Sequence, residues 1–257
     1  MNSSAVSPGR AGLFLLLTGQ MLPLIDTSIT NVALDSITHS LDASATQLEL
    51  IVALYGVAFA VCLAMGSKLG DNYGRRRLFM WGVTLFGVAS LLCGMASSIG
   101  ELLAARTLQG AGAALIVPQI LATLHVTLKG SAHARAISLY GGIGGIAFIV
   151  GQMGGGWLVS ADIAGLGWRN AFFINVPICL LVLAFSQRYV PGNAARRPLD
   201  NRLAGHLQPG ADPLLPAVPN GAGAGAALAV DAAADAGGGA AAAGMDARER
   251  AAQTASR

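Results

Sequence analysis

The chain has 257 residues, of which 54% are apolar and only 11% are charged, and glycine occurs 34 times. A water-soluble domain needs far more charge on its surface, so this composition excludes most soluble classes of protein. The formal net charge of +3 reflects lysines and arginines in short loops, described below, and gives no reason to expect a nucleic-acid partner.

The apolar residues gather into blocks that are long enough to cross a membrane. These blocks cover residues 11–34, 50–67, 78–99, 107–128, 136–161 and 170–187, with Asp26 as the charged residue of the first block. We predict membrane-spanning helices, because the short alternating strands of a membrane barrel have a different pattern. The first block is too long for a signal peptide and contains an acid, so we expect it to be retained.

Lysines and arginines in alternate short loops predict the orientation of the chain in the membrane. They are concentrated after the second and fourth blocks, at Lys68, Arg75, Arg76, Arg77, Lys129 and Arg135. The opposite loops are poor in basic residues. We therefore expect a multi-pass protein of the plasma (inner) membrane with both termini in the cytoplasm.

We expect three regions, namely a cytoplasmic N-terminus (1–10), a six-span domain (11–190) and a tail (191–257). From about Leu199 the tail consists largely of alanine, glycine, proline and aspartate. It lacks the large apolar residues needed to bury a core, so disorder is expected. We interpret it as the result of a frameshift or truncation, because GC-rich DNA read out of frame gives such a composition; a genuine cytoplasmic tail is the alternative.

The first polar motif lies within the first block, as Leu24-Ile-Asp26-Thr27-Ser28-Ile-Thr30-Asn31-Val-Ala-Leu34. An isolated acid inside a membrane helix is a candidate functional group. Asp26 and Thr30 share one face of a helix, so we predict that they line a central cavity. The alternative is that Asp26 only pairs with another helix.

The loop after the second block reads Gly66-Ser-Lys-Leu-Gly70-Asp71-Asn-Tyr-Gly74-Arg75-Arg76-Arg77. Gly66 and Gly70 allow helices to approach closely, and Gly74 permits a sharp turn. Asp71 is placed to pair with Arg75 or with a helix end. The alternative is a simple basic anchor at the membrane surface.

The fourth span opens with Leu102-Leu-Ala-Ala-Arg106-Thr-Leu-Gln109-Gly110-Ala-Gly112-Ala-Ala114. An arginine inside a membrane helix is costly and normally faces a cavity or a partner. Snorkelling of Arg106 to the outer interface is the alternative.

Two further motifs lie in and after the fifth block. The fifth block contains Gly151-Gln152-Met-Gly154-Gly155-Gly156, a glycine density that favours close helix packing and bending. The sixth block is entered through Trp168-Arg169-Asn170-Ala-Phe172-Phe173-Ile174-Asn175-Val176-Pro177.

These five motifs, in this order, resemble the signatures of the major facilitator superfamily. The loop is similar to GxLxDxxGRRxx and the fourth block to RxxQGxGxA. The first and sixth blocks are similar to LDxTIVNVAL and WRWxFxINVP, which are typical of the fourteen-span drug:proton antiporters. The fifth block resembles the antiporter motif GPxxGG, except that Gln152 replaces the proline.

The resemblance implies an all-α membrane fold of six helices, equivalent to the N-terminal half of a transporter and built from two inverted three-helix repeats. It implies proton-coupled export of amphiphilic small molecules, with the lipid bilayer, protons and the substrate as partners and no cofactor. A C-terminal half or a second copy would complete the substrate site. The implied proton-coupling and cavity residues are Asp26, Thr30, Asn31, Arg106 and Gln109. The implied cytoplasmic gate is Gly66, Gly70, Asp71, Gly74, Arg75 and Arg76, and the helix-packing motif is Gly151, Gln152, Gly155 and Gly156.

Three other classes are open at this point. An inactive truncated fragment would share every motif, and a metabolite uptake transporter is the nearest rival within transport because of Gln152. An intramembrane enzyme is disfavoured, since the sequence has no GxSxG, no HExxH and no nucleotide-binding GK[ST] loop. We therefore expect neither an enzyme nor a metal site. Cys62, Cys93 and Cys179 fall in separate apolar blocks and are interpreted as small buried side chains.

Overall fold

The computed structural model describes residues 9–190, and nearly all of these residues are helical. The helices are α1 (Arg10–Leu41), α2 (Ala45–Tyr73), α3 (Arg75–Met95), α4 (Ile99–Thr127), α5 (Gly130–Ser160), η1 (Ile163–Gly165), η2 (Gly167–Arg169), α6 (Asn170–Phe173) and α7 (Asn175–Tyr189). Within this range, six stretches are long and apolar enough to cross a membrane, the sixth running from Gly167 to Tyr189. The predicted all-helical architecture with six spans is confirmed; the predicted tail, 191–257, and residues 1–8 lie outside the described residues.

The helices extend beyond the predicted apolar blocks, because polar residues continue them past the hydrocarbon core. α2 begins at a capping box, in which the Ser44 side chain accepts from the backbone N–H of Gln47 and the Gln47 side chain accepts from the backbone N–H of Ser44. α2 and α3 meet at Gly74, whose φ of 92° favours glycine. The sharp turn predicted at this glycine is therefore present.

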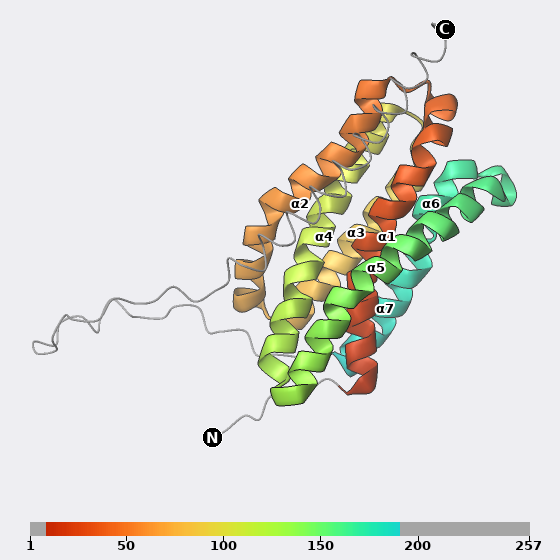
Figure 1. Ribbon diagram of the computed structural model, residues 1–257. Coiled ribbons are helices and arrows are strands. Elements are labelled where there is room, and N and C mark those ends of the chain that lie inside the picture. Colours follow the sequence, from red (N-terminus) through yellow and green to blue (C-terminus); the bar gives the residue numbers. More distant parts are fainter. Residues whose placement is uncertain (1–8, 191–257) are drawn as a thin grey trace, which may run out of the picture. The chain divides into compact units, whose positions relative to one another are not determined.

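Helix packing relates the first three spans to the last three (Figure 1). α1 packs along α5 and α2 packs along α4, while α3 contacts α4 and α7, and α1 contacts α7. In a repeat of three helices, α1 corresponds to α4, α2 to α5, and α3 to α7. The α1–α5 contact then corresponds to the α4–α2 contact, and the α1–α7 contact corresponds to the α4–α3 contact. Two repeated three-helix units give this pattern.

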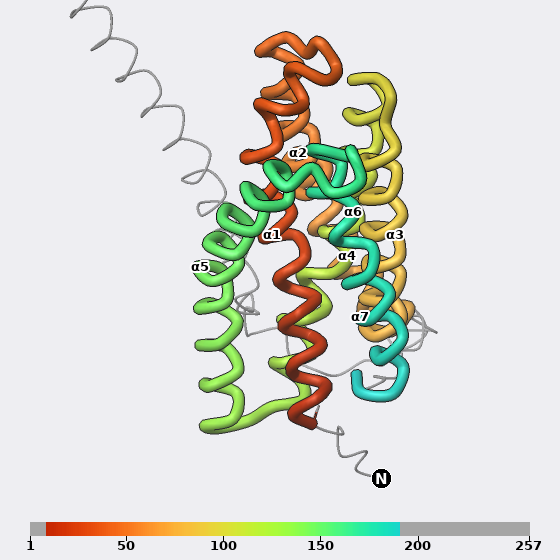
Figure 2. Tube along the Cα trace, turned by 90° about the vertical axis from the view of Figure 1, so that its right-hand side faces the viewer, coloured from red at the N-terminus to blue at the C-terminus, as the bar shows by residue number. Residues whose placement is uncertain are grey.

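One end of the bundle, called here the basic end, contains the α2–α3 and α4–α5 junctions. Figure 2 shows the start of α1, the turn between α4 and α5 and the end of α7 at this same end. Its basic residues include Lys68, Arg75, Arg76, Arg77, Lys129 and Arg135 of the two junctions, with Arg10 of α1 and Arg188 of α7. The alternation of basic loops in the sequence thus corresponds to one end of the folded bundle.

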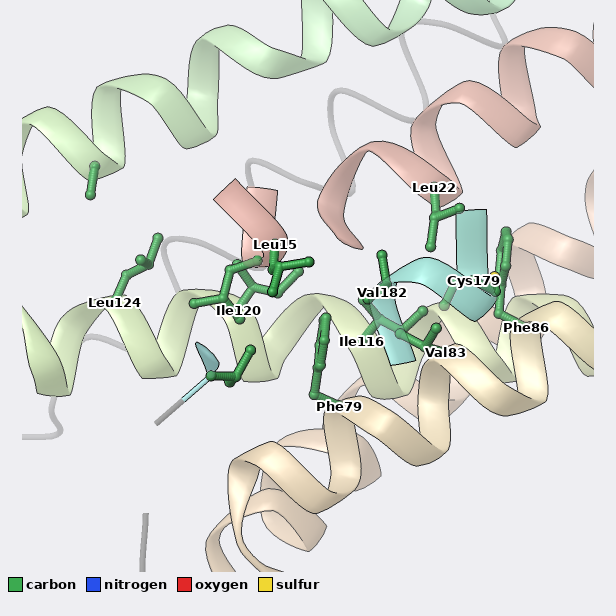
Figure 3. Close-up of a cluster of buried hydrophobic side chains, with 14 of the residues drawn as sticks. Leu15, Leu22, Phe79, Val83, Phe86, Ile116, Ile120, Leu124, Cys179 and Val182 are labelled. Carbon is green, nitrogen blue, oxygen red and sulfur yellow. The ribbon is translucent and has the colours of Figure 1, made fainter. Parts of the chain in front are cut away.

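Two clusters of buried apolar side chains fill the bundle. The cluster nearer the basic end includes Leu15, Leu22, Phe79, Val83, Phe86, Ile116, Ile120, Leu124, Cys179 and Val182, from α1, α3, α4 and α7 (Figure 3). The cluster nearer the other end includes Ile29, Ile37, Ile51, Cys93, Leu102, Trp168 and Phe172. α1, α3 and α4 therefore contribute to both clusters, whereas α7 contributes to the first and α6 to the second.

α2 and α5 lie on the outside of the bundle and carry many exposed apolar side chains. Examples are Val57, Val61, Ile149 and Met153. Lipid and neighbouring helices are both apolar surroundings, so such faces are compatible with a membrane.

Candidate functional site

A layer of buried polar side chains lies between the two apolar clusters. We call it the polar layer and define it as Asp26 of α1, Ser90 of α3, Arg106 and Gln109 of α4, and Asn175 of α7. All five side chains are buried. Four separate helices thus place polar groups at one level between two apolar clusters, where an unpaired polar group would be costly.

Asp26 is the acceptor at the centre of the polar layer. Its Oδ2 accepts from Nη1 of Arg106 at 2.5 Å. Its Oδ1 accepts from Nε2 of Gln109 at 2.7 Å and from Nδ2 of Asn175 at 2.8 Å. Three donors from α4 and α7 therefore surround this carboxylate, an arrangement that suits the ionised form.

Arg106 is held by contacts on several sides. Its Nη1 also donates to Oε1 of Gln109 at 2.6 Å, and its Nε donates to the backbone carbonyl of Ile51 in α2 at 3.3 Å. The guanidinium carbon lies 4.3 Å from the centre of the Tyr55 ring. The guanidinium is thus balanced by the carboxylate of Asp26 and by an aromatic face, which makes its burial in a membrane helix tolerable.

Gln109 and Ser90 complete the hydrogen bonds of the layer. Nε2 of Gln109 donates to Oγ of Ser90 at 2.8 Å, and Oγ of Ser90 donates to the backbone carbonyl of Phe86 at 2.8 Å. The Gln109 amide consequently has partners at both its nitrogen and its oxygen.

The structure separates the residues predicted to form the proton-coupling site. Asp26, Arg106 and Gln109 meet in the polar layer, whereas Thr30 donates to the backbone carbonyl of Asp26 at 2.7 Å and Asn31 is exposed on the bundle surface. The Asp26 carboxylate pairs with donors on other helices, as in the alternative given above, and the central cavity lined by Asp26 and Thr30 stays a prediction. Arg106 is fully buried and does not snorkel.

Glycines of the loop motif bring α2 against α4. A Cβ atom at Gly66 would lie 2.5 Å from the backbone carbonyl oxygen of Ala114. Pro118, four residues after Ala114, has no N–H to donate to that carbonyl. The Ala114 carbonyl is therefore free to face Gly66. Gly70 packs against Gln119, whose Nε2 donates to the backbone carbonyl of Gly66 at 2.8 Å.

The charged residues of the same motif connect four helices at the basic end. Nη2 of Arg75 donates to Oδ1 of Asp71 at 3.1 Å, and Nη1 of Arg75 donates to the backbone carbonyl of Ala122 in α4 at 2.8 Å. Arg76 donates to the backbone carbonyl of Gln187 in α7 at 3.3 Å. The motif therefore joins α2, α3, α4 and α7.

The glycine motif of α5 packs against α1. Gly151 lies against Ser28, and Gly155 lies against Ile29. Oγ of Ser28 donates to the backbone carbonyl of Phe148 at 3.0 Å. Gln152 is half-buried, and Gly156 lies near Val32 with room for a Cβ atom at 4.0 Å.

Three contributors to the site were not predicted from the sequence. Asn175 belongs to the motif at the sixth block, but nothing in that motif indicated that it reaches Asp26. Ser90 and Tyr55 lie in apolar blocks with no signal that marks them. Within residues 9–190, no group of three or more potential metal ligands is present.

The sequence matches the family model of the Major Facilitator Superfamily over residues 16–234. The "Probable actinorhodin transporter" of Streptomyces coelicolor is 37% identical over 73% of this chain and 33% of that protein. The "Puromycin resistance protein pur8" of Streptomyces alboniger is 35% identical over 76% of this chain and 39% of that protein. The "Methyl viologen resistance protein SmvA" of Salmonella typhimurium is 37% identical over 67% of this chain and 34% of that protein. The chain spans about a third to two-fifths of the length of these relatives.

Solved structures with the same fold come from other transporters. A peptide transporter in complex with sulfate superposes with a TM-score of 0.62 at 14% identity, covering 78% of this chain and 44% of that chain. A bacterial homologue of the human lysosomal transporter Spinster, inward-facing and unoccupied, gives a TM-score of 0.59 at 22% identity over 75% of this chain and 46% of that chain. These similarities show a shared fold.

Proposed function

This chain belongs to the Major Facilitator Superfamily, and we propose that it provides the proton-coupling half of an exporter that exchanges amphiphilic small molecules for protons. Family membership and six apolar helices make it a multi-pass membrane protein. The names of two relatives, which refer to resistance to puromycin and methyl viologen, support export of organic cations. The activity we propose is transport and not enzymatic catalysis.

The observation that carries the coupling proposal is the buried ion pair between Asp26 and Arg106. A proton that binds Asp26 removes the charge that balances Arg106, and it weakens the hydrogen bonds from α4 and α7. Protonation therefore favours a different arrangement of these helices from the one favoured by the carboxylate. Such a difference between the two states is what proton-driven transport requires.

We further propose that the basic end faces the cytoplasm, with both termini on that side of the plasma (inner) membrane. The Asp71–Arg75 pair and its bond to Ala122 then form a cytoplasmic gate, in which breaking contacts between α2 and α4 accompanies opening. A second half or a second copy of the chain would complete the substrate site, and the apolar faces of α2 and α5 offer surfaces for it.

Uptake of a metabolite is the second candidate function. The observation that favours it is Gln152, which stands where the antiporter motif has proline. This candidate retains proton coupling through Asp26 and differs in the direction of substrate movement.

Ligand-driven proton release tests the coupling proposal directly. The chain is purified together with a complementary C-terminal half of a relative and mixed, in a weakly buffered detergent solution, with tetraphenylphosphonium, an amphiphilic cation. Released protons are measured with a pH indicator. We expect release from the parent and none from Asp26→Asn. Equal release from both proteins would remove Asp26 from the coupling mechanism.

The direction of transport needs a cellular measurement. Efflux of a fluorescent cationic dye is compared in cells that express this chain alone and in cells that express it together with a complementary C-terminal half of a relative. We expect proton-dependent efflux only with the added half. Robust efflux from the chain alone would support a complex of two copies.

A further inference from the structure

Asn175 is the member of the polar layer whose hydrogen bonding is incomplete. It is the first residue of α7, is 1% exposed, and donates through Nδ2 to Oδ1 of Asp26 at 2.8 Å. Its Oδ1 is buried and has no hydrogen-bond partner among the described residues. A buried acceptor without a donor is destabilising, so an unpaired oxygen beside a charged group calls for an explanation.

The other amide of the layer, Gln109, is fixed in its orientation. Its oxygen accepts from Arg106, and its nitrogen donates to both Asp26 and Ser90. Rotating this amide by half a turn would place oxygen against oxygen and nitrogen against a guanidinium. The Asn175 oxygen has no such constraint, so a half turn of the side chain breaks only the bonds that Nδ2 donates, to Oδ1 of Asp26 at 2.8 Å and to Oγ of Ser90 at 3.5 Å.

Protonation of Asp26 changes what its neighbours must supply. The carboxylate needs donors, and it has three. The carboxylic acid carries its proton on Oδ1, because Oδ2 faces the Arg106 cation, and that proton needs an acceptor. The Asn175 oxygen reaches this position when the amide rotates, whereas the Gln109 amide continues to donate to the same oxygen atom.

We propose that Asn175 is a positioning residue that adapts to the protonation state of Asp26. Its amide donates to the carboxylate, and after a half turn it accepts the hydrogen bond of the carboxylic acid. The proton is transferred from a hydronium ion, so that one O–H bond of the hydronium breaks as the O–H bond of Asp26 forms and a water molecule is released. This inference rests on the proposed function, because it assumes that Asp26 binds and releases a proton.

The remaining titratable groups near Asp26 come from each helix around it. They are Arg106 of α4, Tyr55 of α2, Cys93 of α3 and Cys179 of α7, while Tyr140 is the titratable side chain of α5 that lies beside Gln20 of α1. None of these is an amide with a free oxygen. The Tyr55 hydroxyl is also buried without a partner among the described residues, but Asn175 is the one of the two that already bonds to Oδ1 of Asp26.

Infrared difference spectroscopy tests the proposal on the full chain in lipid nanodiscs. Spectra at high and low pH are subtracted, and the C=O band of protonated Asp26 is assigned by its loss in Asp26→Asn. In Asn175→Leu we expect this band to shift to higher wavenumber, because the acid has lost its acceptor. Asn170→Leu is the matched control, since Asn170 is also buried but donates to the backbone carbonyl of Ile163; there the band should stay in place.

A second measurement does not depend on the folding of Asn175→Leu. Asparagine labelled with ¹³C at the side-chain carbonyl is incorporated into the parent, and a labelled amide band should shift over the same pH range in which the Asp26 band appears. That shift should vanish in Asp26→Asn. An unshifted amide band, or an Asp26 band at the same wavenumber in Asn175→Leu and in the parent, would overturn the role of Asn175 and leave the proposed function intact. The absence of any Asp26-dependent band in the parent would overturn the proposed function as well.

Discussion

The guanidinium Nη1 of Arg106 lies 2.5 Å from Oδ2 of Asp26, and both side chains are only 1% exposed. This pair joins α1 to α4, the first helices of the two three-helix units. Each charge is tolerated in an apolar bundle because the other is present.

Removing one partner of this pair should destabilise the bundle strongly. We expect Arg106→Gln to lower the free energy of unfolding by about 3–5 kcal/mol, because it leaves an unbalanced buried carboxylate. The double variant Asp26→Asn/Arg106→Gln should recover much of that loss. Thermal unfolding of the purified chain in detergent measures both, with Arg77→Gln, at an exposed residue, as the control. A single-variant loss no larger than that of Arg77→Gln would contradict the buried pair.

Gly66 should tolerate no side chain, in contrast to another glycine of the same helix. Gly66→Ala places a Cβ atom 2.5 Å from the Ala114 carbonyl oxygen, whereas a Cβ at Gly56 meets nothing within 4 Å. Since a backbone atom cannot move aside cheaply, we expect Gly66→Ala to cost about 1–3 kcal/mol. Gly56→Ala should be neutral or stabilising, because alanine favours helix more than glycine does. Equal unfolding temperatures for the two variants would show that α2 and α4 are not in this close contact.

The pair of Asp71 and Arg75 should affect conformation more than stability. Both side chains are partly exposed, so their ion pair contributes at most about 1 kcal/mol. Asp71→Ala nevertheless releases Arg75, which bonds to the Ala122 carbonyl of α4. We expect a broader distance distribution between spin labels at the exposed positions Asn72 and Val126, measured by pulsed electron resonance.

The matched control for this variant is Lys68→Ala, because Lys68 is exposed near the same end of α2. Its distance distribution should equal that of the parent. A distribution for Asp71→Ala that also matches the parent would argue against a gate at this motif.

Ser28 should make proline acceptable at position 152. A proline there would remove the N–H that bonds to the carbonyl four residues earlier, at Phe148, and Ser28 already donates to that carbonyl. We expect Gln152→Pro to be less destabilising than Met153→Pro by about 1 kcal/mol, the net value of one hydrogen bond. The comparison is made by unfolding in detergent. Adding Ser28→Ala should remove this advantage; if the advantage persists without the hydroxyl, another group supports the bend.

Much of the fold followed from the sequence. Runs of apolar residues fix where helices cross a membrane, because every backbone polar group in lipid must be bonded within a helix. The turn predicted at Gly74 is similarly local, since it depends on neighbours within a few residues. Successive spans cross the membrane in opposite directions, so the loops that lie on one side can be identified from the sequence without tertiary information.

The arrangement of the polar layer was decided by tertiary structure. The sequence marked Asp26, Arg106 and Gln109 as candidates, but their meeting depends on how α1 packs against α4, across a sequence separation of 80 residues for the ion pair. The sequence could not show that donors on α4 and α7 hold the Asp26 carboxylate in a buried network, and the cavity position of Asp26 stays a prediction. The roles of Ser90 and Asn175 followed only from the structure, because each depends on the group that the side chain contacts in space. The pattern of apolar residues in the sequence gives no information on such a contact.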